Sequence, residues 1–291
     1  MQELYGIRAG LADYARANLA DYDGVLVCTP SNQHVPQATR AAQAGCHLFV
    51  EKPISTTMDG VDDLIALCHE SHLILQVGYV YRHHPLFAEM QEVLASGDLG
   101  PIHMALLKVG YPVDRARPDF RSTYWVQAAT GGGVFHDASH CLDFIQELLS
   151  PITAVTAQAR HYEFEVDPEV EDAAVALFEF ESGALGSATF NHFQRNRTSR
   201  VELVGARGTI LWEIEKHQLV VYRDADRSWQ RHRFELEPDD MYLNQMRSFL
   251  GALAGRNEPL VTGEDGRRTL LVVLACLQSA RDGARTATPP G

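Results

Sequence analysis

The sequence predicts an α/β fold in two parts, a parallel-sheet domain at residues 1–78 and an α+β domain at residues 79–291. Two observations lead to this prediction. In the first part, short apolar runs alternate with helical stretches, which is the order of elements in a parallel sheet with helical crossovers. From residue 79 onward, strand-like runs follow one another through tight turns, so a large, mainly antiparallel open sheet is expected there.

The parallel strands are predicted at three apolar runs, residues 24–28, 47–50 and 73–78. Helices are expected between them, over residues 35–45 and after residues 55–57, where apolar residues recur at helical spacing. Ligands of such sheets bind beyond the carboxyl ends of the strands. The segments at those ends are Thr29-Pro30-Ser31-Asn32, Glu51-Lys52-Pro53 and Tyr79-Val80-Tyr81-Arg82.

The second part contains seven predicted strands and several amphipathic helices. One helix is expected at residues 86–96, ending before Gly97, and two more at residues 240–254 and 266–281. A further helix follows a glycine-rich segment at residues 131–144. The predicted strands lie at residues 102–109, 154–159, 173–180, 184–191, 200–204, 209–213 and 219–222.

Composition narrows the class of protein. The formal net charge is −13, which argues against nucleic acid or an anionic membrane as a partner, because either requires a basic face. We find no secretory signal and no apolar run of about 18 residues that could span a membrane. The five cysteines are widely spaced without a CxxC pair, which favours reduced thiols in a cytoplasmic protein.

The segment from Gly131 to Phe144 is where we expect the chemistry. Its three consecutive glycines permit positive φ angles and the close approach of another molecule. On a helix, His136, Asp137 and His140 would project from one face, and a carboxylate beside an imidazole forms an oriented acid/base pair. The imidazole is expected to titrate near its reference pKa of about 6.5. The structural alternative is a glycine turn followed by an aspartate N-cap and a buried histidine.

Two histidines four residues apart, His136 and His140, also have the spacing of zinc ligands on a helix. The chain contains neither an HExxH motif nor a cysteine cluster. The sequence therefore predicts no metal site.

Three motifs, Glu51-Lys52-Pro53, Gly78-Tyr79-Val80-Tyr81-Arg82 and the segment Gly131 to His140, occur in one order and spacing. Together they resemble the Gfo/Idh/MocA family of oxidoreductases over essentially the whole chain. The resemblance implies a Rossmann-like parallel-sheet domain that binds NAD or NADP, followed by a domain whose large open sheet often mediates dimer contacts. A cytoplasmic homo-oligomer, a dimer or a tetramer, is therefore expected.

The resemblance also implies roles for particular residues. Its catalytic lysine, carboxylate and histidine fall on Lys52, Asp137 and His140, although the carboxylate and histidine are three residues apart here and four apart in many members. We expect the substrate to contact Lys52, Tyr81, Trp125, His136 and His140. The residues expected to contact the cofactor are Thr29, Pro30, Asn32, His34, Glu51, Lys52, Pro53 and Arg82.

The GxGxxG turn that begins this family's dinucleotide-binding domain is not in the sequence, so the parallel-sheet domain is expected to be incomplete. We therefore expect this chain to bind dinucleotide weakly. The leading function is hydride transfer between NAD(P) and a sugar, cyclitol or related polyol, with His140 as the base. The alternatives are an NAD-dependent glycosidase of the same fold, or a cofactor-free binding protein if the short N-terminus is genuine.

Overall fold

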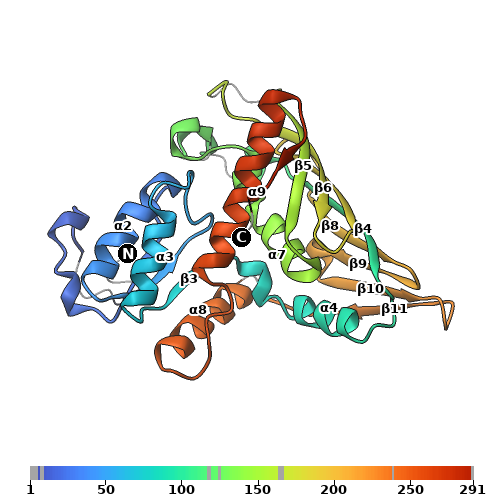
Figure 1. Cartoon of the computed structure of the whole chain (residues 1–291), viewed down its shortest axis with the longest axis horizontal. Coiled ribbons are helices and arrows are strands. Elements are labelled where there is room, and N and C mark those ends of the chain that lie inside the picture. The colour runs from blue at the N-terminus through green and yellow to red at the C-terminus, as the bar shows by residue number, and fades with distance from the viewer. Residues whose placement is uncertain are drawn as a thin grey trace.

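The computed structural model describes residue 6 and residues 10–116, 119–123, 126–162, 167–237 and 239–289. These residues form two β-sheets, a small parallel sheet A and a large mixed sheet B. Figure 1 shows sheet A with its helices on one side, sheet B on the other, and the long C-terminal helix between them. The α/β fold expected from the sequence is confirmed.

Sheet A contains three parallel strands in the order β1-β2-β3. Helix α2 (His34–Gln43) connects the first two strands and α3 (Val61–Glu70) the second pair. Their apolar faces bury Ala38, Ala41 and Leu64 completely, as expected for crossover helices on a parallel sheet. The strands are β1 (Gly24–Val27), β2 (His47–Val50) and β3 (Leu75–Val77).

Sheet B contains nine strands in the order β11-β10-β9-β8-β4-β7-β6-β5-β12. All neighbours are antiparallel except β4 and β7, which run parallel at the centre of the sheet. The strands are β4 (Ile102–Gly110), β5 (Ile152–Arg160), β6 (Ala173–Phe180), β7 (Leu185–Asn191), β8 (Thr198–Gly205), β9 (Gly208–Glu213), β10 (Gln218–Arg223), β11 (Ser228–Arg233) and β12 (Thr286–Ala287).

Helices cover one face of sheet B and enclose its core with it (Figure 1). The longest, α9 (Gly263–Asp282), begins with a capping box between Thr262 and Asp265. It also joins the two parts, because Leu270 and the preceding Val261 pack in the core of the parallel-sheet part. The other helices are α4 (Pro85–Ala95), α5 (Val113–Ala116), α6 (Val134–Asp137), α7 (Ser139–Leu149) and α8 (Asp240–Leu253).

The opposite face of sheet B carries exposed apolar side chains. Met104 on β4 is the register partner of Leu185 on β7, and both are about half exposed. Val175 and Leu177 on the adjacent β6 are exposed to a similar degree. Exposed apolar groups on neighbouring strands form a patch of the kind that mediates association.

Two strands were not expected, because β11 is polar and exposed and β12 contains only two residues. The helix expected over the glycine-rich segment is broken into α6 and α7 at Ala138. Within the described residues, no helix combines the length and the apolar character needed to cross a membrane.

Candidate active site

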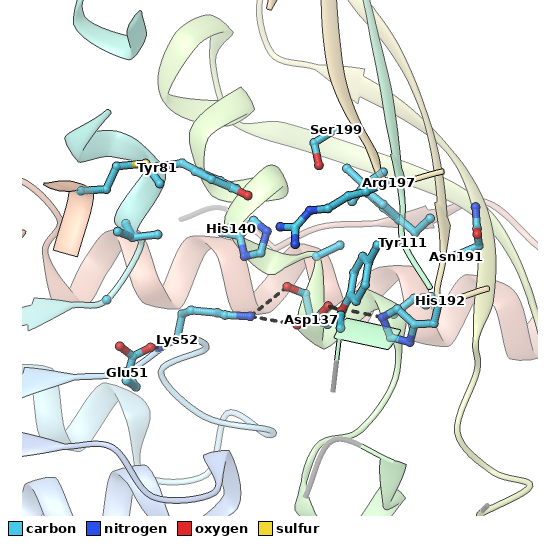
Figure 2. A pocket seen from close by; sticks show the side chains of 18 of the residues that line it. Glu51, Lys52, Tyr81, Tyr111, Asp137, His140, Asn191, His192, Arg197 and Ser199 are labelled. Atoms are coloured by element: carbon cyan, nitrogen blue, oxygen red, sulfur yellow. Dashed lines mark hydrogen bonds and ion pairs between the residues drawn. The ribbon is translucent and has the colours of Figure 1, made fainter. Parts of the chain in front are cut away.

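A pocket of about 420 Å³ lies between the carboxyl ends of sheet A's strands and the helix-covered side of sheet B. Glu51, Lys52 and Gly78 line it from sheet A, and Asp137 and His140 line it from α6 and α7. Figure 2 shows the side chains of Lys52, Asp137 and His140 converging with others from sheet B. The structure therefore brings together the three residues predicted to be catalytic, at the edge where parallel sheets bind ligands.

Two glycines allow the segment before α6 to pass close to other parts of the chain. Gly131 has φ 86° and Gly133 has φ 111°, angles that side chains rarely tolerate. A Cβ atom on Gly131 would lie 2.3 Å from the Thr56 side chain, and one on Gly133 would lie 2.4 Å from the Glu171 carboxylate. This packing fixes the start of α6, and therefore Asp137 at its end.

The ammonium group of Lys52 is held by Asp137. Its Nζ donates to the backbone oxygen of Asp137 at 3.0 Å and to Oδ1 at 3.2 Å. Lys52 follows β2 and Asp137 ends α6, so this ion pair joins the two parts of the molecule. Both side chains retain roughly a quarter of their exposure, 22% and 24%, because they border the pocket.

Two residues from sheet B hold the other oxygen of the same carboxylate. The Tyr111 hydroxyl donates to Asp137 Oδ2, and His192 Nε2 donates to that oxygen at 3.3 Å. Tyr111 follows β4 and His192 follows β7, and their ring centroids lie 5.2 Å apart. Neither residue was expected from the sequence.

These contacts determine the ionisation of Asp137. Burial raises its pKa, but the charge of Lys52 and the hydrogen bond from His192 outweigh burial, so the pKa lies well below its ordinary value. The carboxylate is therefore ionised at neutral pH and acts only as an acceptor. It fixes the lysine, the phenol and the imidazole around one point of the pocket.

His140 does not form the expected hydrogen-bonded pair with Asp137. Among the described residues its ring instead meets Tyr81 edge-on, with centroids 4.7 Å apart. Burial, and next the charge of Lys52, lower the pKa of His140 to about 3, although Asp137 opposes them. The expectation of titration near pH 6.5 is therefore wrong, and the imidazole is neutral at physiological pH. Tyr81 lines the pocket, as predicted.

The structure corrects the expectation for His136. Its side chain on α6 is buried and is not part of the pocket lining. Burial lowers its pKa to about 4, against the backbone oxygens of Gly132 and Thr56. Because the helix is broken at Ala138, His136 and His140 do not share one helix face, which the spacing of zinc ligands requires. No group of three or more candidate ligands for a metal ion occurs in the described part of the chain.

The cofactor contact expected of Arg82 is also corrected by the structure. Its side chain is only 2% exposed, and its Nη2 and Nε donate to the two oxygens of buried Asp143 at 2.7 and 2.8 Å. Nη1 faces Glu147 at 3.0 Å and Asp265 at 3.4 Å. A guanidinium enclosed by three carboxylates does not reach the pocket, so the expected cofactor contact is replaced by a structural role.

His34 has a structural role as well. Its ring nitrogens lie 2.8 Å from two backbone oxygens, those of Thr29 and Pro53, and the side chain is buried. It braces the ends of β1 and β2 against each other and is not part of the pocket lining. Trp125, expected to contact the substrate, lies outside the described residues.

The remaining residues predicted for the cofactor lie together at the carboxyl ends of β1 and β2. Thr29 Oγ1 is buried and lacks a hydrogen-bond partner among the described groups, and Glu51 and Lys52 open directly onto the pocket. Asn32 donates to the backbone oxygen of Ala129 beside the glycine segment. The unpartnered Thr29 hydroxyl and the pocket edge beside Glu51 and Lys52 fit the nicotinamide end of a dinucleotide.

Comparisons with known proteins agree with this geometry. Residues 5–79 match the family model described as an oxidoreductase family with an NAD-binding Rossmann fold, and residues 87–211 match the GFO/IDH/MocA C-terminal domain. The fold and the pocket thus define an oxidoreductase whose cofactor is NAD or NADP. The chain belongs to the Gfo/Idh/MocA family, whose two models together match more than half of it.

Individual relatives are distant but align over most of their length. Myo-inositol 2-dehydrogenase of Thermotoga maritima is 27% identical over 97% of this chain and 85% of its own length. The scyllo-inositol 2-dehydrogenase (NAD(+)) of Bacillus subtilis is 28% identical over 90% of this chain and 76% of its own. Levoglucosan dehydrogenase in complex with NADH superposes with a TM-score of 0.92 at 21% identity, covering 100% of this chain and 86% of that chain.

Proposed function

We propose that the protein transfers hydride between NAD(P) and a secondary alcohol of a sugar, cyclitol or related polyol. The observation that carries this proposal is the Lys52–Asp137 ion pair at the mouth of sheet A, facing a pocket of about 420 Å³. That volume suits a monosaccharide, and the relatives whose names specify a substrate include dehydrogenases of inositols and a reductase of an anhydro sugar.

In this proposal the bound cofactor supplies the hydride acceptor or donor, and the chain's own residues handle the proton. Lys52 donates a hydrogen bond to the substrate oxygen and stabilises the negative charge that develops there. Asp137 keeps the ammonium in place, since it accepts from Nζ through both its backbone and its carboxylate.

His140 remains our proposed base for the oxidation direction. A base must be unprotonated, and the lowered pKa of about 3 keeps this imidazole neutral at physiological pH, although the same shift makes it a weaker proton acceptor. The proton that it accepts is placed near the Asp137 carboxylate, whose charge favours the imidazolium. Tyr81 orients the ring by its edge-on contact.

The experiment is incubation with NAD and a panel of inositols and monosaccharides, with NADH followed by its absorbance and the products analysed by mass. A dehydrogenase accumulates NADH and a product two hydrogens lighter. Cleavage of a glycoside without net NADH would show a glycosidase instead, and no reaction with any substrate would contradict both.

We further propose that this cytoplasmic enzyme is a homo-oligomer that associates through the exposed face of sheet B. The half-exposed Met104, Leu185, Val175 and Leu177 occupy neighbouring strands of that face. Sedimentation velocity should give a dimer or tetramer that Leu177→Lys dissociates, while a monomeric wild-type protein would contradict the proposal.

A further inference from the structure

The pocket contains a second cation besides Lys52. Arg197 lies in the loop between β7 and β8, and its side chain is 57% exposed although it borders the pocket. Figure 2 shows its guanidinium pointing toward His140. Arg197 also lowers the pKa of His140, as does Lys52, so the imidazole has a cation near it on both sides.

Neighbouring residues fix the position of this guanidinium. Its Nε donates to Glu215 Oε1 at 2.7 Å, and Ser199 Oγ donates to the same oxygen at 3.1 Å. The guanidinium carbon lies 5.8 Å from the centre of the Tyr111 ring. Arginine has five N–H donors, and within the described chain only Nε has a hydrogen-bond acceptor. The two Nη groups are therefore held in place with their donors free toward the pocket.

Lys52 is bound to Asp137, whereas the two Nη groups of Arg197 have no acceptor among the described residues. A guanidinium has donors and no acceptor, and its planar fork complements a carboxylate better than a hydroxyl, which both donates and accepts. We propose that Arg197 binds a carboxylate of the substrate, so that the enzyme acts on a sugar acid, an aldonate or uronate. This inference rests on the hydride-transfer function proposed above.

The arrangement of the pocket sets where the reaction occurs on such a substrate. Lys52 and Arg197 lie on different sides of His140 (Figure 2). With its carboxylate on Arg197, a sugar acid extends past His140 and presents a carbinol carbon to Lys52. An overall charge of −13 would repel an anion, so a fixed cation inside the pocket is the feature that admits one.

The test compares acids with their neutral amides of the same shape. Calorimetric titration of the full chain uses D-glucuronate against D-glucuronamide, D-galacturonate against D-galacturonamide, and D-gluconate against D-gluconamide. At least one acid should bind about 10- to 100-fold more tightly than its own amide, the range for a charge-assisted hydrogen bond. Arg197→Met should bring that ratio close to one, and Arg197→Lys should retain part of it.

The matched control is Arg195→Met, because Arg195 lies in the same loop but pairs with Asp114 outside the pocket lining. It should leave the acid-to-amide ratio unchanged. Equal binding of acid and amide in every wild-type pair overturns the inference, as does a preference that survives Arg197→Met. Tighter binding of D-glucose 6-phosphate than of any acid also overturns it, in favour of a phosphate site.

An activity assay separates this inference from the proposed function. NADH formation from neutral polyols without any preference for acids would remove the sugar-acid inference and leave hydride transfer standing. If no substrate yields NADH, the proposed function fails, and the binding ratio still reports on Arg197. For an active acid, Arg197→Met should raise KM about 10-fold or more and change kcat much less.

Discussion

Two ion pairs connect segments that follow strands of sheet A to the helices α6 and α7, and they differ in almost every other respect. Lys52 meets Asp137 at the end of α6, and Arg82 meets Asp143 within α7. The first pair borders the pocket, and the second is completely buried. Burial raises the pKa of Asp143 to about 6 against the opposing charge of Arg82, whereas the pKa of Asp137 lies well below its ordinary value.

The difference shows what separates a reactive pair from a structural one. Asp137 receives a lysine, a phenol and an imidazole, and its lysine borders the pocket, where a ligand can reach it. The donors of Arg82 face three carboxylates, and none of them lies near the pocket. Access to a cavity, more than the presence of opposite charges, therefore decides which pair can do chemistry.

The largest effect should come from breaking the buried pair. Arg82→Met leaves Asp143 buried without its partner, so we expect the free energy of unfolding to fall by about 3–5 kcal/mol at pH 7. The deficit should shrink as the pH is lowered toward 5, because the folded state then holds Asp143 in its neutral form. Urea denaturation at several pH values measures both effects.

The control for that variant is Arg285→Met, which removes an exposed ion pair with Glu179. Exposed pairs contribute little to stability because solvent screens their charges, so this variant should stay close to the wild type. An Arg82→Met deficit as small as that of Arg285→Met would show that burial does not make the inner pair structural.

Breaking the Lys52–Asp137 pair at the pocket should change the activity and not the stability. Lys52→Met removes the proposed donor to the substrate oxygen, and kcat should fall by roughly 10²- to 10³-fold. Asp137 keeps its bonds to Tyr111 and His192, so the urea midpoint should hardly move. Steady-state kinetics with Lys108→Met, an exposed lysine of β4, provides the comparison. A Lys52→Met enzyme with most of its kcat would refute the catalytic role.

A smaller effect is expected at the imidazole that supports Asp137. His192→Phe keeps a ring in place but loses the Nε2 donor, so Asp137 should hold Lys52 less firmly and kcat should fall about 10-fold. His192→Gln offers a replacement amide donor and should recover much of the loss. If both variants lose activity equally, the ring itself matters and the hydrogen bond does not.

Much of the fold could be predicted, because buried strands and helix faces leave apolar patterns in the local sequence. Strand β11 left none, since all its side chains except Trp229 are polar and it lies at the edge of the sheet. Lys52 and Asp137 could be found because each stands in a local motif, Glu-Lys-Pro or the glycine segment. Arg82 stood in a motif as well, and only the structure shows that its side chain points inward.

Tyr111 and His192 could not be found, for a topological reason. They follow β4 and β7, which pair in parallel with Gly110 opposite Asn191, so the next residue of each strand emerges at the same place. These strands are distant in sequence and join through intervening elements. No local pattern specifies that pairing, and therefore none indicates that a phenol and an imidazole share one carboxylate oxygen.

The contrast between residues at the pocket and residues in the interior also applies to the histidines. The smallest predicted effect concerns His84, which lies in the interior. His84 is buried as the N-cap of α4, where its Nδ1 accepts the Leu86 N–H at 3.0 Å. Burial, and next His217, lower its pKa to about 4. Protonation would destroy the acceptor, whereas the unfolded chain takes up that proton near its reference pKa of about 6.5. His84 therefore stabilises the fold above about pH 6.5, and this stability is lost as the pH falls toward 4.

His84→Asn tests this, because asparagine is also a good N-cap and does not titrate. Between pH 7 and 5.5, the wild type should lose about 1 kcal/mol more unfolding free energy than the variant. Urea titrations at both pH values measure the difference, with the exposed His103→Asn as the matched control. His140→Gln should show a similar loss of pH dependence together with a fall in kcat, since His140, unlike His84, faces the pocket. Equal pH dependence in wild type and His84→Asn would mean that protonation leaves the cap intact.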